Sequence, residues 1–452
     1  MHSNVQYPQN PLVPSIPSKN NIDNRNDWHG LFSHDPAVFY DDIGETYYIY
    51  STDAGPGCDK EFGGQIRCSK DLIHFNYLTT ALRENIPDEV REHTKAKTIW
   101  APDIIKYEDE YRLYYSASTF GSQYSAIGLA ISGSPEGPFL PKGIVIKTTP
   151  ESPVNAIDAN IVTDHITGQQ YMVYGSFWDG IRILRLNNET GLADEEGYGL
   201  RIASRPKETV DGAIEGPYIR YNNDTGYYYL FVSYESLSNH YNVRVGRSKV
   251  IAGPYLDFNG RDMLEHCDTP YDIGLKITSG YSFKPSTGWI AFGHNSVINR
   301  NGDWYLVCHA RYESNQQLHN LHVHKMFWTK EGWPVVNPVM YAGEYLQALS
   351  EKDIIGNYAR IDFQNDVSNL FLTPQTFSLQ ESGICELSRD GILIHGTWEL
   401  DQFKLMIKYD MNSRSFIEEH FVIPSWDYEE NTGTLTFTGM DQYGHCSWGK
   451  KI

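Results

Sequence analysis

The stretch EGPYIRYNNDTGYYYLFVSY, residues 215–234, contains a short apolar segment, a polar Asn-Asp-Thr-Gly turn and a second segment rich in Tyr, Val and Leu. Two strand-like segments joined by a tight turn predict a β-hairpin. The same pattern, led each time by a polar residue, recurs at residues 34–51, 101–117, 157–176 and 294–311. A unit that recurs in this way indicates a repeat architecture.

The spacing of the hairpins predicts how many strands each repeat contains. Their leading polar residues are Asp35, Asp103, Asp158, Glu215 and Asn295, which lie 68, 55, 57 and 80 residues apart. Each interval leaves room for a second hairpin, such as those expected at 125–139 and 241–255. Units of about four strands arranged around an axis form a β-propeller. The sequence therefore predicts an all-β protein with a five-bladed propeller.

The repeat also suggests where the domains begin and end. We expect an N-terminal extension at 1–27 and the propeller at 28–349. From about Ser350 the strands alternate without a leading polar residue, as in TGTLTFTGMD. Residues 350–452 are therefore predicted to form a separate small β-barrel or sandwich.

Composition narrows the choice of partner. The chain has 37 Lys and Arg against 57 Asp and Glu, a formal net charge of −20. This balance argues against nucleic acid, which requires clustered basic residues. No run of 18 apolar residues is present, so a membrane-spanning helix is not expected. Aromatic residues make up 13% of the chain and include 32 Tyr and 10 Trp. They suit stacking against sugars as well as ordinary β-sheet cores.

The start of the chain leaves the compartment open. It lacks the charged start and apolar core of a secretory signal. We expect a secreted or periplasmic protein if a signal segment has been removed, and a cytoplasmic one otherwise. Six scattered cysteines, with no C-x-x-C pair, give little support for a zinc or redox site. Whether Cys58 and Cys68 bridge a loop stays open.

Three carboxylates are predicted to meet at one end of the propeller. The first strand of each blade lines the central channel, so matching repeat positions bring Asp35, Asp158 and Glu215 together. Like charges in one pocket raise the pKa of at least one of them. One raised and one ordinary carboxylate supply the acid and the base of glycoside hydrolysis. The alternative is that such residues cap turns or pair with Arg. Asp103 follows Trp-Ala-Pro, and we expect it to be offset and to hold a loop.

Several motifs resemble glycoside hydrolase family 43, and within it the α-1,5-L-arabinanases. They are HDPAVF (34–39), IWAPDI (99–104), NAIDANIV (155–162), AIEGPYI (213–219) and GHNSVI (293–298). The resemblance spans roughly residues 28–345 and implies a five-bladed propeller of inverting hydrolases. It implies that Asp35 is the general base, Glu215 the general acid and Asp158 the carboxylate that tunes the acid. The C-terminal part resembles the extra β-domain of two-domain arabinanases, with a supporting role or an effect on substrate access.

The same resemblance implies a metal and a set of substrate contacts. His294 corresponds to the channel histidine that helps to hold a metal, usually calcium, largely through water. The alternative is a histidine bonded only to channel waters. Arabinan or arabino-oligosaccharides are the implied substrates. The expected substrate-binding residues are Trp100, Phe120, Asn160, Ser176, Phe177 and Arg311, for each of which plain core or turn packing is the alternative.

Other activities on this scaffold stay open. An α-L-arabinofuranosidase or a β-xylosidase would use the same three carboxylates. A non-catalytic carbohydrate-binding propeller, or an interaction scaffold, would not need them. Endo or exo action depends on the loops at the channel mouth, and the sequence does not decide it.

Overall fold

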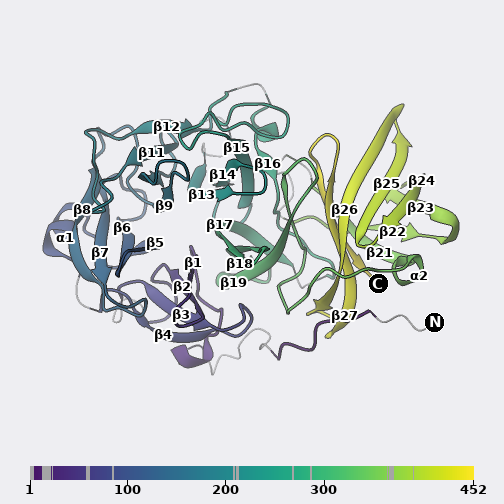
Figure 1. Ribbon diagram of the computed structural model, residues 1–452, viewed down its shortest axis with the longest axis horizontal. Coiled ribbons are helices and arrows are strands. Elements are labelled where there is room, and N and C mark those ends of the chain that lie inside the picture. Colours follow the sequence, from purple (N-terminus) through teal and green to yellow (C-terminus); the bar gives the residue numbers. More distant parts are fainter. Residues whose placement is uncertain are drawn as a thin grey trace.

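The computed structural model describes residues 5–12, 22, 24–57, 62–83, 86–206, 209, 213–266, 269–285, 288–363, 365, 371–389 and 391–452. Its strands form five four-stranded antiparallel sheets and one closed eight-stranded barrel (Figure 1). The predicted five-bladed propeller is confirmed. Of the two forms expected for the C-terminal part, the barrel is the correct one.

Each blade consists of four strands that follow one another in the chain. Blade 1 contains β1 (Ala37–Asp41), β2 (Thr46–Ser51), β3 (Gln65–Ser69) and β4 (Asn76–Thr80), and blade 2 contains β5 (Trp100–Tyr107), β6 (Glu110–Ala117), β7 (Ser125–Ser132) and β8 (Leu140–Thr148). Blade 3 contains β9 (Asn160–Thr163), β10 (Gln170–Tyr174), β11 (Ile181–Arg185) and β12 (Leu200–Ala203). Blade 4 contains β13 (Ile214–Asn222), β14 (Tyr227–Tyr234), β15 (Asn242–Ser248) and β16 (Leu275–Lys276), and blade 5 contains β17 (Trp289–Arg300), β18 (Asp303–Tyr312), β19 (Asn315–Trp328) and β20 (Pro334–Val336).

The barrel follows a one-turn helix. Helix α2 (Glu351–Ile354) precedes β21 (Gly356–Asp362), β22 (Gln375–Leu379), β23 (Ile384–Arg389), β24 (Ile392–Asp401), β25 (Lys404–Met411), β26 (Arg414–Asp427), β27 (Thr432–Asp441) and β28 (Cys446–Lys451). Among the residues that the structure describes, the other helices are η2 (Arg25–Asp27), α1 (Asp88–Thr94), η4 (Pro270–Asp272) and η5 (Glu381–Gly383). Figure 1 shows the barrel beside blades 4 and 5, where a common hydrophobic core joins it to the propeller.

The hairpin motif forms because its turn chemistry suits it. In blade 4, Tyr221 pairs with Tyr228 and Asn222 with Tyr227 across the turn. Gly226 takes a φ of 65°, a left-handed conformation that glycine adopts without a steric penalty, and donates its N–H to the Asn222 carbonyl at 2.8 Å.

The ring of blades closes through the segment that precedes blade 1. Leu31 forms a β-bridge with Asn320 on β19, and the N–H of Phe32 donates to the His319 carbonyl at 2.9 Å. The Ser296 hydroxyl of β17 accepts the N–H of Val38 at 3.1 Å. Blade 5 is thereby joined to blade 1.

Each blade has a residue with a left-handed backbone just before its inner strand or within it. These residues are Asp35, Ala101, Asp158, Gly216 and His294, with φ values of 53°, 35°, 63°, 56° and 46°. Regular pairing with the second strand resumes two residues later in each blade. The repeat register expected from the sequence is therefore wrong in two blades, because Glu215 lies one residue before the equivalent position and Asn295 one after it. Asp103 lies two residues after it, and its offset was expected.

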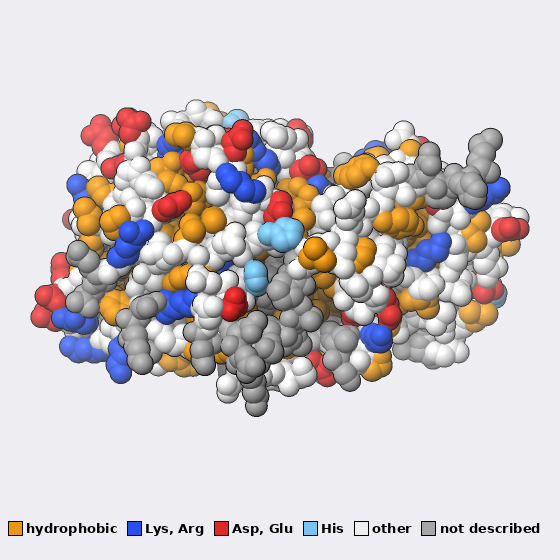
Figure 2. Space-filling model, turned by 90° about the horizontal axis from the view of Figure 1, so that it is seen from below, with side chains coloured by type: hydrophobic (Ala, Val, Ile, Leu, Met, Phe, Trp, Pro, Cys, Tyr) orange, Lys and Arg blue, Asp and Glu red, His pale blue; other side chains and the backbone are white. Residues whose placement is uncertain are grey.

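The face of the molecule drawn in Figure 2 has a mixed surface. Lys and Arg side chains are interspersed there with Asp, Glu and hydrophobic side chains and do not form a broad basic patch. Among the helices of the described residues, none combines the length and the apolar character that crossing a membrane requires.

Candidate active site

A cleft of about 960 Å³ opens at the end of the channel where the inner strands begin. It brings together the three predicted carboxylates Asp35, Asp158 and Glu215. The other predicted site residues that line it are Trp100, Phe120, Ser176, Phe177, His294 and Arg311. The residues come from all five blades.

Asn160 does not line the cleft, which corrects the expectation that it binds substrate. Its side chain is buried between blades. The Nδ2 group donates to Asp103 at 3.1 Å, and Oδ1 accepts the N–H of Ile219 at 2.9 Å. Asp103 also accepts the N–H of Ile161 at 2.7 Å. Asp103 is offset as expected, but it holds the inner strand of the next blade and not a loop.

Asp35 is surrounded by hydrogen-bond donors. His34 Nδ1 lies 2.8 Å and His294 Nδ1 3.1 Å from its Oδ1, and the Thr52 hydroxyl donates to its Oδ2 at 2.6 Å. Burial alone would raise the pKa of Asp35, but the facing histidines lower it well below its ordinary value. Asp35 is therefore a carboxylate over the whole neutral range, which is the state a general base requires.

Arg311 acts on Asp35 through His34. Its Nη2 lies 3.0 Å from His34 Nε2, while its Nε and Nη1 donate to the carbonyls of Leu237 and Gln316. A guanidinium is only a donor, so His34 Nε2 must accept and His34 Nδ1 must carry the proton. The arginine thereby sets the tautomer that lets His34 donate to Asp35.

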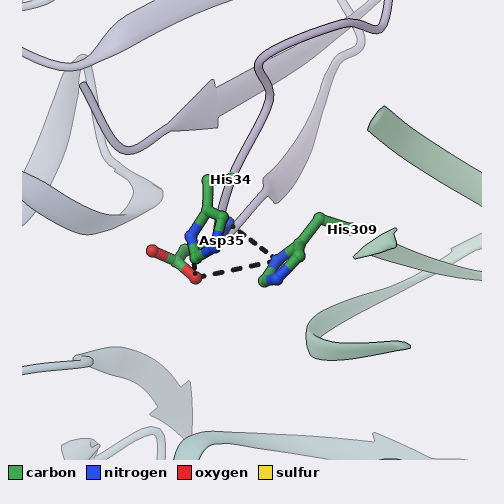
Figure 3. Close-up of side chains that lie close together, drawn as sticks. All are labelled: His34, Asp35 and His309. Atoms are coloured by element: carbon green, nitrogen blue, oxygen red, sulfur yellow. Dashed lines mark hydrogen bonds and ion pairs between the residues drawn. The ribbon is translucent and has the colours of Figure 1, made fainter. Parts of the chain in front are cut away.

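His309 completes this cluster from the fifth blade, as Figure 3 shows. Its ring stacks on that of His34 with centroids 3.8 Å apart, and its Nδ1 accepts the backbone N–H of Asp35 at 3.2 Å. Among the described residues, His34, Asp35 and His309 form the one histidine and carboxylate group whose ligand atoms all lie within 4.8 Å of one another. Hydrogen bonds already occupy the facing Nδ1 atoms, so the group holds together without an ion.

Glu215 accepts two hydroxyl donors. Tyr241 donates to its Oε1 at 2.6 Å and Ser176 to its Oε2 at 2.8 Å. Burial raises the pKa of Glu215, and these two hydrogen bonds only partly oppose the rise. In other blades the corresponding side chains, Thr52 and Ser116, accept the N–H of the left-handed residue. Ser176 instead serves the carboxyl group.

Asp158 lies next to this group and shares its environment. Its Oδ2 accepts the N–H of Gly216, the residue after Glu215, at 3.2 Å. Burial raises the pKa of Asp158 to about 7, with the charges of Glu215 and Asp35 adding to the rise and His294 opposing it. Two buried carboxyls with raised pKa values hold a proton between them near neutrality. The site thus contains a proton source opposite an ionised base.

The residues that the sequence did not single out are Tyr241, Thr52, His34 and His309. His34 stands next to Asp35 in the His-Asp-Pro motif, so its position was visible. Tyr241 begins the second hairpin of blade 4, and nothing in that motif indicates that its hydroxyl reaches Glu215. The Tyr241 ring packs against Gly293 and fits there because glycine has no side chain. A Cβ at this position would lie 2.0 Å from the ring.

The cleft wall contains aromatic rings and few charges outside the cluster. Phe120 is 88% exposed, and Trp100 and Phe177 are half-buried at the mouth. Phe177 has a left-handed backbone with φ 54°. Flat apolar rings next to hydrogen-bonding groups suit a neutral, hydroxyl-rich ligand.

Three carboxylates surround His294 and favour positive charge there. Burial would lower the pKa of His294, but Asp35, Asp158 and Glu215 raise it to about 9, so this part of the channel attracts positive charge. Calcium prefers six to eight oxygen ligands, and one imidazole supplies none. Carboxylates and waters of the cleft would have to provide them.

A base that stays ionised, an acid pair that holds a proton and an aromatic cleft at a propeller mouth define a glycoside hydrolase. Glycosyl hydrolases family 43 matches residues 29–334, and a C-terminal lipocalin-like domain of that family matches residues 338–449. The chain belongs to family 43.

Similar proteins cover nearly the whole chain. An extracellular endo-α-(1→5)-L-arabinanase of Thermotoga petrophila is 31% identical over 93% of this chain and 93% of its own length. The crystal structure of the endo-1,5-α-L-arabinanase from this organism superposes with a TM-score of 0.81 at 30% identity, covering 94% of this chain and 99% of that one. The structure of an α-L-arabinanase of Cellvibrio cellulosa complexed with arabinohexaose superposes with a TM-score of 0.58 at 32% identity. It covers 68% of this chain and 96% of that one.

Proposed function

We propose that this protein hydrolyses the α-1,5 bonds between L-arabinofuranosyl units of arabinan, with inversion at the anomeric carbon. The observation that carries the proposal is the difference in hydrogen bonding between two carboxylates of the cleft: Asp35 faces two imidazoles at 2.8 and 3.1 Å, whereas Glu215 has only hydroxyl donors and lies beside Asp158. The family and its arabinanase members support the choice of substrate.

In the proposed reaction the two sides of the cleft act together. Asp35 removes a proton from a water molecule, whose oxygen forms a bond to the anomeric carbon. Glu215 gives its proton to the glycosidic oxygen as the bond from that oxygen to the anomeric carbon breaks. The products are a reducing arabinose end and a free hydroxyl on the leaving chain. Asp158 stabilises the proton on Glu215 before the step through its own negative charge.

We extend the proposal to a calcium ion held near His294, mainly through water. Such an ion would supply fixed positive charge and ordered water in the channel. His294 would orient the water shell, while its hydrogen bond to Asp35 positions the base.

We also infer that the protein acts outside the cell. The relative from Thermotoga petrophila is described as extracellular, and a polymer such as arabinan is met there. The test is to measure the amount of this protein in the culture medium of the source organism and the amount retained in washed cells. Most of the protein should be in the medium.

Product analysis on linear arabinan tests the activity, with the wild type beside Glu215→Gln. The wild type should release arabino-oligosaccharides, and the variant should lose about 10²- to 10⁴-fold in rate because its amide cannot donate the acid proton. Glu196→Gln, an exposed glutamate, is the matched control and should keep full activity. An active Glu215→Gln enzyme would contradict the assignment, and a wild type inactive on arabinan would contradict the substrate.

The alternative activities make a different prediction for the same assay. An α-L-arabinofuranosidase or a β-xylosidase would cleave the corresponding aryl glycosides faster than linear arabinan. A non-catalytic carbohydrate-binding propeller would bind arabinan and release nothing. A ladder of product sizes at early times would indicate endo action, and one dominant small product exo action.

A further inference from the structure

Asp53, the residue after Thr52, is a buried carboxylate that the proposed reaction does not use. It is 8% exposed and does not line the cleft. Its Oδ1 accepts the N–H groups of Gly63 and Gly64 at 3.1 and 2.9 Å, and its Oδ2 accepts those of Gly63 and Ile99, each at 2.9 Å. Burial raises the pKa of Asp53 to about 6, and these N–H groups oppose the rise. The charged form therefore prevails at neutral pH and binds three backbone N–H groups.

The three N–H groups belong to two segments that are separate in the sequence. Gly63 and Gly64 precede β3 of blade 1, whereas Ile99 precedes β5 of blade 2. Both glycines have a positive φ, 124° and 80°, a conformation that other residues rarely adopt. Gly64 also approaches Ile99 closely, since a Cβ on this glycine would lie 2.8 Å from the Ile99 Cδ1. Asp53 therefore joins both ends of the connection between β2 and β3 and binds that connection to blade 2.

Trp100, which lines the cleft, lies between two residues that blade 1 holds by hydrogen bonds. On one side, Ile99 donates its N–H to the Asp53 carboxylate, and its carbonyl accepts the N–H of Asp53 at 3.1 Å. On the other side, Ala101 donates its N–H to the Thr52 hydroxyl at 2.8 Å. The backbone of Trp100 is therefore fixed from both sides, and this determines where the indole meets the cleft.

The hydroxyl that serves the base does not depend on the Asp53 side chain. The N–H of Thr52 donates to the His34 carbonyl at 2.9 Å, and the Thr52 hydroxyl donates to Asp35 at 2.6 Å. Loss of the Asp53 carboxylate should therefore disturb the segment of Trp100 and leave the donors of Asp35 in place.

We infer that Asp53 is a positioning residue for substrate binding, whose carboxylate holds Trp100 at the cleft wall and acts on the sugar chain through that indole. The inference rests on the proposed function. A ring that is already fixed loses little conformational freedom when a sugar stacks on it, so its position affects affinity more than the chemical step.

Asp53→Asn tests the inference with linear arabinan as the substrate. In either orientation of the amide its Nδ2 faces an N–H group, so at least one hydrogen bond is lost. KM should rise by about 2- to 12-fold, as expected when the stacking of one ring is impaired. The value of kcat should stay close to that of the wild type. A role confined to stability would lower the free energy of unfolding and leave KM unchanged, and that result would overturn the inference.

A double-mutant cycle with Trp100→Ala tests whether Asp53 acts through the indole. Trp100→Ala removes the ring and should raise KM at least as much as Asp53→Asn does. In the Trp100→Ala background, Asp53→Asn should change KM no further, because coupled residues are not additive. Two fully additive effects on KM would overturn the inference.

Asp41→Asn is the matched control, because this buried carboxylate also joins blades 1 and 2. Its Oδ2 accepts the N–H of Gly44 at 2.6 Å, and its Oδ1 accepts the hydroxyl of Tyr111 at 2.7 Å. Asp41 is the last residue of β1 and does not line the cleft. The variant should lose stability and keep the KM of the wild type.

Gly64→Ala reaches the same segment with the carboxylate intact and serves if Asp53→Asn does not fold. The added Cβ should displace Ile99 and raise KM, and Ile99→Val, which removes Cδ1, should restore KM in the double variant. An unchanged KM in folded Gly64→Ala would overturn the positioning role alone, provided that the wild type cleaves arabinan. A wild type that leaves arabinan intact would overturn the proposed function as well.

Discussion

Two buried glutamates, Glu215 in the propeller channel and Glu418 in the barrel, behave in opposite ways. Burial raises the pKa of both, but Arg360 and His420 lower that of Glu418 well below its ordinary value. Arg360 binds the two Glu418 oxygens through Nη1 and Nη2 at 2.8 and 2.7 Å. Glu215 has only hydroxyl donors. The pKa of Glu215 therefore stays raised.

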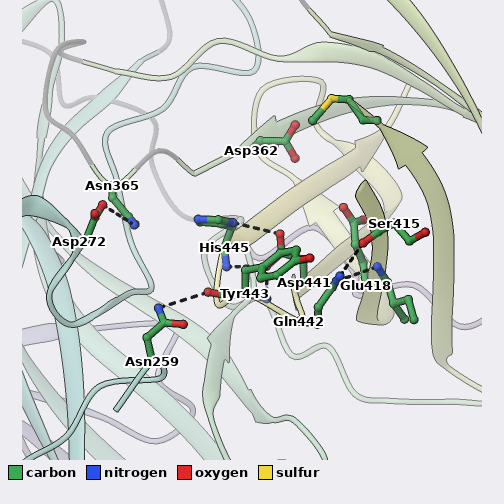
Figure 4. A network of polar contacts seen from close by, with 12 residues as sticks. Asn259, Asp272, Asp362, Asn365, Ser415, Glu418, Asp441, Gln442, Tyr443 and His445 are labelled. Carbon is green, nitrogen blue, oxygen red and sulfur yellow. Dashed lines mark hydrogen bonds and ion pairs between the residues drawn. The ribbon is translucent and has the colours of Figure 1, made fainter. Parts of the chain in front are cut away.

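The difference shows that burial alone does not make a carboxyl group an acid catalyst. A guanidinium keeps its charge at every relevant pH, so it fixes Glu418 as an anion. Hydroxyl groups carry no charge and leave Glu215 able to hold and release a proton. Glu418 lies on β26, and polar contacts near it join the barrel to the propeller (Figure 4). They include Asn259 Nδ2 on the Tyr443 carbonyl and Asn365 Nδ2 on Asp272.

The largest effect is expected from removing Arg360, the arginine that keeps Glu418 ionised. Arg360→Met leaves Glu418 buried without its cation, and we expect a loss of about 3–5 kcal/mol in the free energy of unfolding. Chemical denaturation measures this loss. At temperatures where the variant is folded, kcat should not change, because no carboxylate of the cleft contacts Arg360.

The double variant Arg360→Met with Glu418→Leu is the control. It removes the charge together with its partner and should recover much of the lost stability. If Arg360→Met alone were as stable as the wild type, the view of Glu418 as a structural anion would be wrong.

Calcium should sharpen the comparison, because no guanidinium binds Glu215 as Arg360 binds Glu418. If the proposed ion binds near His294, calcium at 100 times its Kd should stabilise the protein by about 2.7 kcal/mol. Thermal unfolding followed during a calcium titration measures this. His294→Gln should weaken the response, whereas Arg360→Met should keep it. An unchanged response in His294→Gln would place the ion elsewhere.

The smallest effect is expected from the hydroxyl that bonds the acid. Tyr241 donates to Glu215 and thereby favours its charged form, so Tyr241→Phe should raise the pKa of Glu215 further. As the pH rises, activity is lost when the pair of Asp158 and Glu215 gives up its proton. The alkaline limb of kcat/KM should therefore move to higher pH.

The pH profile has a matched control in Tyr218→Phe. The Tyr218 hydroxyl bonds the Val297 carbonyl at 3.2 Å, and the residue does not line the cleft. Its removal should leave the alkaline limb in place. A shift of the limb to lower pH in Tyr241→Phe would contradict the proposed direction.

Much of this arrangement follows from local sequence. The alternation of apolar strands with Asn-Asp-Thr-Gly and similar turns is enough to predict five hairpin units and the propeller, since turn chemistry and strand pattern are local properties. The sequence also indicates that Asp35, Asp158 and Glu215 share one mouth. It did not decide between a barrel and a sandwich at 350–452, because closure depends on pairing between β21 and β28 at opposite ends of the domain.

Tertiary structure alone decided which polar groups face the substrate. Asp103 and Asn160 look like their catalytic neighbours in sequence, yet both bind the backbone of the next blade. Tyr241 reaches Glu215 from another segment of the same blade, and Arg311 reaches His34 from blade 5 to blade 1. The sequence determines the units and their chemistry, whereas contacts between distant segments determine protonation and orientation, because no local pattern encodes them.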